Sequence, residues 1–132
     1  MGGVCGMKIT IPTTPPSINQ YQHWHWAEKR KEKQYWCIEI WALLKLNGHP
    51  KNCRHINVSA DIYFTTNRRR DSQNYASTLY KFLDDALVTA GVIPDDTAEY
   101  ISHDEPVLSV GDKAETVIEI RESDGDVYRQ TI

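Results

Sequence analysis

The strongest constraint on the fold of this chain is a change of hydrophobic period near its middle. Residues 56–64 alternate apolar and polar side chains, which is typical of a strand with one buried face. Residues 75–90 then carry apolar side chains at helical spacing, and Gly91 is a natural residue to end a helix. A strand followed by an amphipathic helix predicts that the helix packs back on a sheet.

The rest of the chain adds strands and one more helix around this unit. Short strands are expected at residues 7–11, 100–101, 107–110 and 116–120. Gly111-Asp112 is expected to form a hairpin turn before the last strand. A long helix is expected from about Trp26 to the stop at Asn47. The order β, α, β, α, β, β predicts one α/β domain over residues 1–132, with two helices on a small mixed sheet and residues 1–6 frayed.

The composition excludes several classes of protein. The chain has 132 residues, of which 40% are hydrophobic and 25% charged, as in an ordinary globular domain. No apolar run approaches the roughly 20 residues of a membrane span, and no export signal stands at the N-terminus, so we expect no membrane partner and a cytoplasmic location. Cys5, Cys37 and Cys53 lie far apart, which favours reduced thiols packed as small apolar groups.

The net charge of −3 hides a separation of charge along the chain. Residues 1–70 hold 11 Lys and Arg against 4 Asp and Glu, whereas residues 71–132 hold 4 against 14. Folding either mixes the two signs or leaves a cationic surface beside an acidic pocket. The second arrangement suits a polyanion that is held by lysines and arginines near carboxylates that bind a cation.

Cations and carboxylates also meet in one short stretch after the predicted central strand. Residues 68–74 read RRRDSQN, and Lys81, Asp85 and the pair Asp95-Asp96 follow. A nuclease that hydrolyses a phosphodiester needs oxygen ligands for Mg²⁺ and positive groups to seat the polyanion. Because the helix between them packs back on the sheet, carboxylates before and after it are expected to converge.

At these residues the sequence resembles the RusA family of Holliday-junction resolvases, which includes phage-encoded relatives. Residues 15–19 are similar to the family's P-P-S-x-N, and a basic helix containing residues 27–30 follows. The family's R-R-x-D-x-D-N, K-x-x-x-D-A-L-x-x-A-G and D-D patterns are matched by residues 69–74, 81–91 and 95–96. The resemblance therefore runs over most of the chain.

The resemblance implies a RusA-like fold and a homodimer that cuts four-way DNA junctions in recombination and repair, with Mg²⁺ or Mn²⁺ as cofactor. Asp71 and Asp96 would be catalytic carboxylates that bind the metal, and Lys81 would contact DNA or the transition-state charge. Asp95 and Gln73 complete the candidate metal site. The candidate DNA-binding residues are Asn19, Lys29, Arg30, Arg68, Arg69, Arg70, Asn74 and Lys81.

Two features differ from the family's pattern. Gln73 replaces the family's second aspartate, and a neutral amide oxygen should bind Mg²⁺ less tightly, although Asp95, Glu99 or Asp104 are possible replacements. The chain also has about four more residues between Asn74 and Lys81 than the shorter family members, close to one helical turn of about 3.6 residues. If these are helical, Lys81 lies roughly 15 Å along the axis from Asp71.

A loop over residues 71–76, with Ser77 or Thr78 as the helix cap, would bring Lys81 closer to Asp71, and we prefer this later start to a cap at Asp71. The Gln73 replacement leaves a second functional hypothesis, a catalytically weak or silent junction-binding protein. A third is an oligomeric scaffold without affinity for DNA.

Some of these residues also have ordinary structural interpretations. Asp71 is a preferred helix N-cap, and Lys81 has a carboxylate one turn away with which it can pair. Residues 23–26, with the sequence HWHW, are expected to place their aromatic rings against DNA or the core rather than to bind a metal. Trp36 and Trp41 are expected to be core or dimer contacts.

Overall fold

Strand β2 (His55–Phe64) is the centre of the sheet in the computed structural model, which describes residues 6–123. One edge of β2 pairs antiparallel with β5 (Glu115–Ser123), which in turn pairs antiparallel with β1 (Gly6–Ile11). The other edge of β2 pairs in parallel with β3 (Ile101–His103) and then, further along, with β4 (Val107–Val110). The described residues thus form a mixed sheet of five strands.

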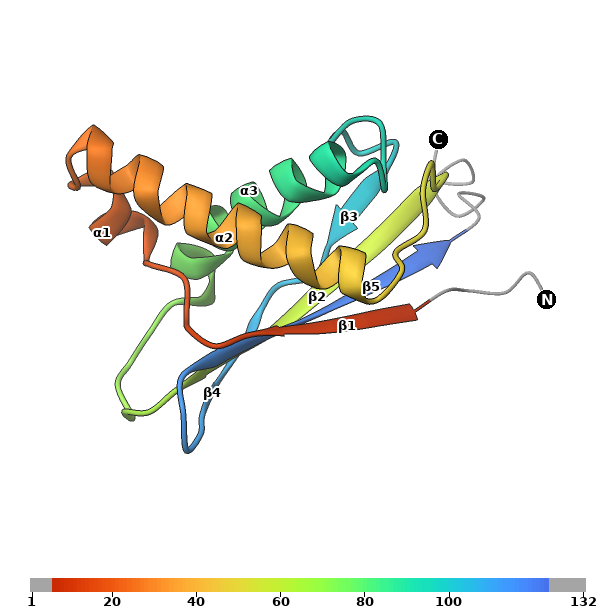
Figure 1. The fold of residues 1–132 in the computed structure, drawn as a ribbon. Coiled ribbons are helices and arrows are strands. Elements are labelled where there is room, and N and C mark those ends of the chain that lie inside the picture. Colours follow the sequence, from red (N-terminus) through yellow and green to blue (C-terminus); the bar gives the residue numbers. More distant parts are fainter. Residues whose placement is uncertain (1–5, 124–132) are drawn as a thin grey trace.

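The helices α1 (Ile18–Gln22), α2 (Trp26–Leu46) and α3 (Ser72–Ala90) lie together on one face of this sheet (Figure 1). The predicted two-layer α/β architecture is therefore confirmed. The short helix α1 was not predicted. Its N-cap is Ser17, whose hydroxyl accepts the backbone N–H of Gln20.

The core lies between the helices and the covered face of the sheet. On β2, every second side chain from Ile56 to Phe64 is buried, as the alternation predicted. The ring of Trp36 on α2 stacks on that of Phe82 on α3, with centroids 6.1 Å apart, so the two helices are joined near their middles. Both rings are fully buried, which confirms that Trp36 is a core residue.

Both ends of α3 can be explained from the sequence, but its start is not the one that we preferred. Asp71 is the N-cap, and its Oδ1 accepts the backbone N–H of Gln73 at 3.1 Å, so the helix already begins at Ser72. The first turns are held by packing as well, because the ring of Tyr75 lies 5.2 Å from that of Phe64. At the other end, Gly91 caps the helix with φ 81°, as predicted.

Two smaller expectations were wrong. The turn at Gly111 does not close a hairpin, because β4 and β5 lie on opposite edges of β2 and do not pair with each other. The long β2 offers β5 nine pairing positions, which a four-residue β4 cannot match. Gly6 was expected to fray, but it pairs with Arg121 in the sheet. Residues 1–5, including Cys5, lie outside the described residues.

The remaining expectations on membranes and thiols are answered only in part. Within residues 6–123, no helix is both long and apolar enough to cross a membrane. Cys53 is buried and Cys37 is half-buried. Burial raises the pKa of the Cys37 thiol, so this side chain behaves as a small apolar group.

Candidate nucleic-acid interface and acidic pocket

The arginine-rich segment lies between β2 and the N-terminus of α3. Arg70 holds this segment in place, because its guanidinium lies 3.9 Å from the ring centroid of Phe64. The same group donates to the backbone carbonyl of Thr66 at 3.0 Å and to its hydroxyl at 2.9 Å. Arg68 and Arg69 are exposed. Arg68, Arg69 and Arg70 were all predicted to contact phosphates, and only Arg68 and Arg69 have exposed side chains.

A second group of predicted residues surrounds the buried ring of Tyr21. The ammonium of Lys29 on α2 lies 5.8 Å from the centroid of this ring, and that of Lys81 on α3 lies 6.0 Å from it. Tyr21 itself belongs to α1 and packs edge-on against Phe82, with centroids 5.7 Å apart. The fold thus brings together two lysines that are far apart in the sequence.

The proline-rich segment before α1 is joined to the same part of α3. The Thr78 hydroxyl donates to the carbonyl of Pro16 at 2.6 Å, and Thr78 is only 1% exposed. Asn19 follows on α1 with an exposed side chain. Its backbone carbonyl accepts a hydrogen bond from Nδ1 of His23 at 2.7 Å. Asn19 therefore lies in the same part of the fold as Lys29 and Lys81.

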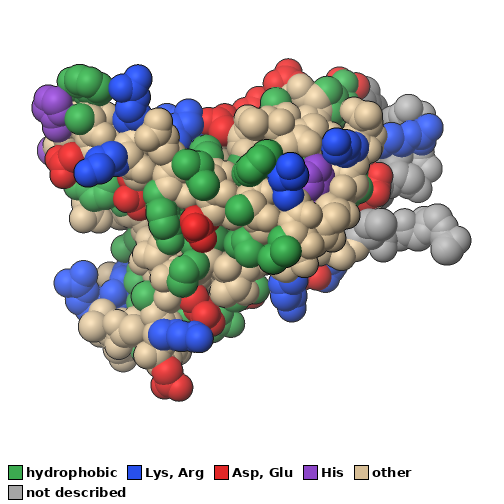
Figure 2. Space-filling model, viewed as in Figure 1, with side chains coloured by type: hydrophobic (Ala, Val, Ile, Leu, Met, Phe, Trp, Pro, Cys, Tyr) green, Lys and Arg blue, Asp and Glu red, His purple; other side chains and the backbone are tan. Residues whose placement is uncertain are grey.

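The end of the molecule that carries α1 also carries the arginine segment (Figure 1). Figure 2 shows Lys and Arg side chains on both the upper and the lower part of that end, with Asp and Glu side chains among them and over the rest of this face. The separation of charge along the sequence is therefore only partly kept in space. We call this end the cationic end, and its exposed cations are Arg30, Lys31, Arg68, Arg69 and Lys81.

An acidic pocket lies at the opposite end of α3. The hollow has a volume of about 440 Å³ and is lined mainly by α2, α3 and the loop that follows α3. Asp85 in its wall makes a 2.7 Å ion pair with Lys33, and this hydrogen bond raises the pKa of the lysine. Asp95 and Asp96 line the pocket with exposed side chains, and Asp95 accepts the backbone N–H of Asp96.

Asp71 and Asp96 do not meet within one chain, contrary to expectation. Helix α3 has 19 residues and is about 28 Å long. Asp71 caps its first turn, whereas Asp96 shares a pocket with Asp85, which lies roughly 21 Å further along the axis. Lys81 likewise lies roughly 15 Å from Asp71 along the axis, because the extra residues before it are helical.

The other predicted residues near Asp71 do not complete a metal site. Gln73 is exposed and Asn74 is half-buried, and both lie in the first turn of α3. Among residues 6–123 there is no group of three or more His, Cys, Asp or Glu side chains that could hold a metal ion. The donor set within a single described chain therefore does not fit the expected Mg²⁺ site.

Two side-chain pairs near these sites were not found from the sequence. Ser72 donates a short hydrogen bond to the carboxylate of Glu105, so this acid lies beside the cap of α3. Asp84 is buried, and both of its oxygens lie 2.9 Å from Nε2 of His103 on β3. Burial raises the pKa of Asp84, while the hydrogen bond from His103 opposes this shift.

The signal for the second pair was present but weak. Asp84 directly follows Leu83, which belongs to the apolar stripe of α3, so its position in the helix is close to the buried face. A buried carboxylate needs a hydrogen-bond donor, but the periodicity does not say which strand supplies it. The ring of Tyr80 covers the pair, with its centroid 4.6 Å from that of His103.

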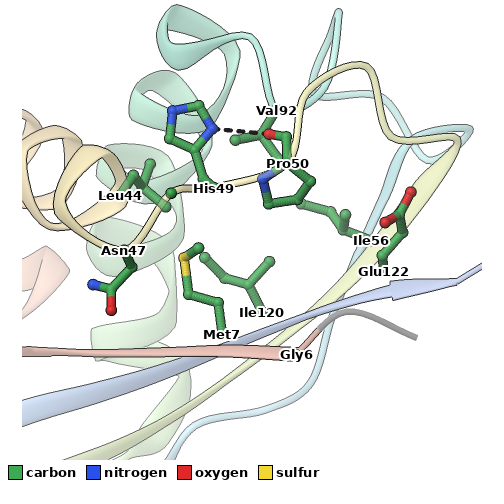
Figure 3. Close-up of a pocket in the computed structure, with 11 residues that line it drawn as sticks. Gly6, Met7, Leu44, Asn47, His49, Pro50, Ile56, Val92, Ile120 and Glu122 are labelled. Carbon is green, nitrogen blue, oxygen red and sulfur yellow. Dashed lines mark hydrogen bonds between the residues drawn. The ribbon is translucent and has the colours of Figure 1, made fainter. Parts of the chain in front are cut away.

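A further cavity is separate from the predicted residues. It has a volume of about 240 Å³ and lies between the end of α2 and the sheet (Figure 3). Its walls are largely apolar and include Met7, Leu44 and Ile120. At its rim, Nδ1 of His49 donates to the carbonyl of Pro50 at 2.8 Å. None of the residues proposed from the sequence line this cavity.

The resemblance to the RusA family rests on sequence motifs alone. No protein-family model matches the chain, and no curated protein matches its sequence.

Proposed function

We propose that this protein binds branched DNA through the cationic end of its helical layer and, as a homodimer, cuts four-way junctions as a metal-dependent endodeoxyribonuclease of the RusA type. The observation that carries the binding part is the grouping of Lys29 and Lys81 around Tyr21, with the exposed Arg68 and Arg69 at the same end. Lysine and arginine contacts of this kind recognise phosphates without reading bases, which suits recognition of junction shape.

Cleavage requires a second copy of the chain. Each α3 has arginines and Asp71 at one end and the acidic pocket with Asp95 and Asp96 at the other. In a two-fold dimer whose α3 helices run antiparallel side by side, Asp71 of each copy would lie toward the acidic pocket of the other. Opposite charges then face each other at both ends, which favours this arrangement over a parallel one.

An apolar groove of about 210 Å³ beside the acidic pocket gives such a dimer a surface to bury. The groove lies between α2 and α3 and is lined by Ile38 and Trp41, which are 62% and 41% exposed, and by Cys37, Ala86 and Thr89. Cys37 and Thr89 also line the acidic pocket, so the two hollows adjoin. Trp41 was expected to be a core or dimer contact, and its exposure in this groove favours the dimer contact.

The carboxylates of Asp71, Asp95 and Asp96, with the amide oxygen of Gln73, are the groups that would hold Mg²⁺ or Mn²⁺ between two copies. When bound, such an ion would polarise a phosphodiester and activate water. The residues of the chain supply the rest: Arg68, Arg69, Lys29 and Lys81 seat the DNA, and Arg70 holds the arginine segment against Phe64.

The test uses the purified chain, a synthetic four-way junction and linear duplex, with titrations of Mg²⁺ and Mn²⁺. We expect the junction to be cut and the duplex spared, and Asp71→Asn and Asp96→Asn each to stop cutting. Mixed dimers of these two inactive variants keep one intact site if the site is shared between copies. Equal mixing then restores about a quarter of the wild-type sites, whereas a site within one chain gives none.

The replacement of an aspartate by Gln73 favours a second candidate function, a junction-binding protein with little or no nuclease activity. Binding without cutting at any metal concentration, together with cutting by Gln73→Asp, would establish this function instead. Absence of binding to any DNA would refute both candidates. Trp41→Ala should lower the dimer fraction measured by analytical ultracentrifugation, and an unchanged fraction would refute the proposed dimer surface.

A further inference from the structure

One aromatic side chain at the cationic end is exposed without a structural reason. Trp26, the first residue of α2, is 65% exposed, whereas Trp36 is fully buried and Trp24 is half-buried. Trp24 packs on Tyr21, with ring centroids 5.9 Å apart. Residues 23–26 were expected to place their rings against either DNA or the core. Trp24 packs on the core, whereas Trp26 faces solvent.

The backbone around Trp26 is held firmly, so its exposure is a property of the fold. His25 is the N-cap of α2, and its Nδ1 accepts the backbone N–H of Ala27 at 3.3 Å. Before Trp26, the backbone N–H of Trp24 donates to the backbone carbonyl of Tyr21 at 3.2 Å, which closes the turn between α1 and α2. The indole of Trp26 thus projects from a corner whose two neighbours are fixed.

The ring is surrounded by groups that favour a flat, electron-rich, anionic partner. The guanidinium of Arg30 lies 5.7 Å from its centroid, and the ring of His25 lies 5.5 Å away at a tilt of 36°. Lys29 and Lys31 lie in the same turns of α2. Two acids lie on the same turns of α2. Glu28 is exposed in the first turn, whereas Oε2 of Glu32 accepts the indole N–H of Trp36 at 3.0 Å.

We propose that Trp26, with Arg30 beside it, stacks on the free face of an unstacked base at the branch point of a DNA junction. This rests on the proposed binding of branched DNA and adds a contact that distinguishes a junction from duplex. Exposed aromatic rings among cations are the usual platforms for unstacked bases, because every nucleotide has a base whose face can stack and a phosphate that a cation can bind. In continuous duplex the bases are stacked on each other and offer no free face to the indole.

Binding of a fluorescent four-way junction and of matched linear duplex is compared for the wild type, Trp26→Ala and Trp26→Phe. Loss of one stacked base should weaken junction binding by on the order of tenfold. Duplex binding should change by less than about twofold, and phenylalanine should restore most of the junction affinity, since it keeps an aromatic face. The control is Leu46→Ala, which removes another exposed apolar side chain, 82% exposed, at the far end of α2.

A second readout reports the base itself. A junction with 2-aminopurine at the branch point should change its fluorescence when the wild type binds, and this change should be absent with Trp26→Ala at saturating protein. The same label within an arm should not respond. Melting temperatures should be equal for all variants, because the replaced side chains are exposed.

The outcomes distinguish failure of stacking by Trp26 from failure of the proposed DNA binding. If the wild type binds the junction but Trp26→Ala binds it equally well, or weakens junction and duplex by the same factor, stacking by Trp26 is refuted while DNA binding stands. A fluorescence change that survives Trp26→Ala also refutes stacking. If the wild type binds no DNA, the proposed function fails and stacking fails with it.

Discussion

Asp71 has a structural role as the cap of α3 and a proposed role in binding metal, and two substitutions separate these roles. Its Oδ1 accepts the backbone N–H of Gln73 at 3.1 Å. Asn caps a helix as well as Asp does, but has no charge, whereas Ala provides neither a cap nor a charge. Asp71→Asn therefore keeps the structural role and removes the negative ligand, while Asp71→Ala removes both.

The magnitudes follow from the geometry. Loss of an N-cap costs about 1 kcal/mol, within a range of roughly 0.5–2 kcal/mol. For a chain of this size, 1 kcal/mol corresponds to roughly 3 °C in melting temperature. Asp71→Ala should thus lower the melting temperature by about 2–6 °C. Asp71→Asn loses only the attraction to the helix dipole, a few tenths of a kcal/mol at moderate salt for this exposed group, or about 1 °C.

The assay pairs thermal unfolding with junction cleavage in the presence of Mg²⁺. Asp71→Asn should unfold nearly as the wild type does and yet fail to cut, whereas Asp71→Ala should lose both stability and activity. Asp112→Ala, which removes an exposed turn aspartate, serves as the control and should change neither. Equal destabilisation by Asn and Ala would refute the capping argument, and full cleavage by Asp71→Asn would refute the ligand role.

Two further predictions concern buried polar groups. Thr78→Val leaves the Pro16 carbonyl without its hydroxyl donor and should cost about 1–3 kcal/mol in chemical denaturation; a cost no larger than that of exposed Thr89→Val would refute this. For Asp84, burial raises the pKa above the ordinary 3.8, so the carboxyl stabilises the fold at low pH and this contribution is lost as pH rises through the native pKa. The melting temperature of Asp84→Asn relative to the wild type should therefore rise with pH from about 4 upward, and parallel or converging curves would contradict the direction of the shift.

Local patterns predicted those parts of the fold that depend on nearby residues. The alternation over residues 56–64 and the helical stripe that ends at Gly91 correspond closely to β2 and α3, because burial of one face determines both. Helix α1 was missed because its five residues are too few to show a period. Its position depends instead on Tyr21 docking against Phe82, which is a contact across the fold.

Contacts between distant segments were the parts that the sequence did not predict. The pairing of β5 with β2 instead of with β4 depends on the length of the strand pairing, and the turn residues at Gly111 give no information on it. The early start of α3 follows from the cap at Asp71 together with burial of Thr78 under Pro16. Neither the Pro16 contact nor the pairing of Asp84 with His103 leaves a periodic signal.

The length of α3 has a consequence for the proposed chemistry. Because Asp71 and the acidic pocket lie at opposite ends of a rigid helix about 28 Å long, no rearrangement of side chains in one chain can join them. The proposed DNA binding through Lys29, Lys81 and the exposed arginines would need only one copy, whereas the proposed cleavage would need two copies in a defined orientation. Binding and cutting should therefore depend differently on protein concentration, and cutting should disappear on dilution below the dimer dissociation constant while a single chain still binds the junction.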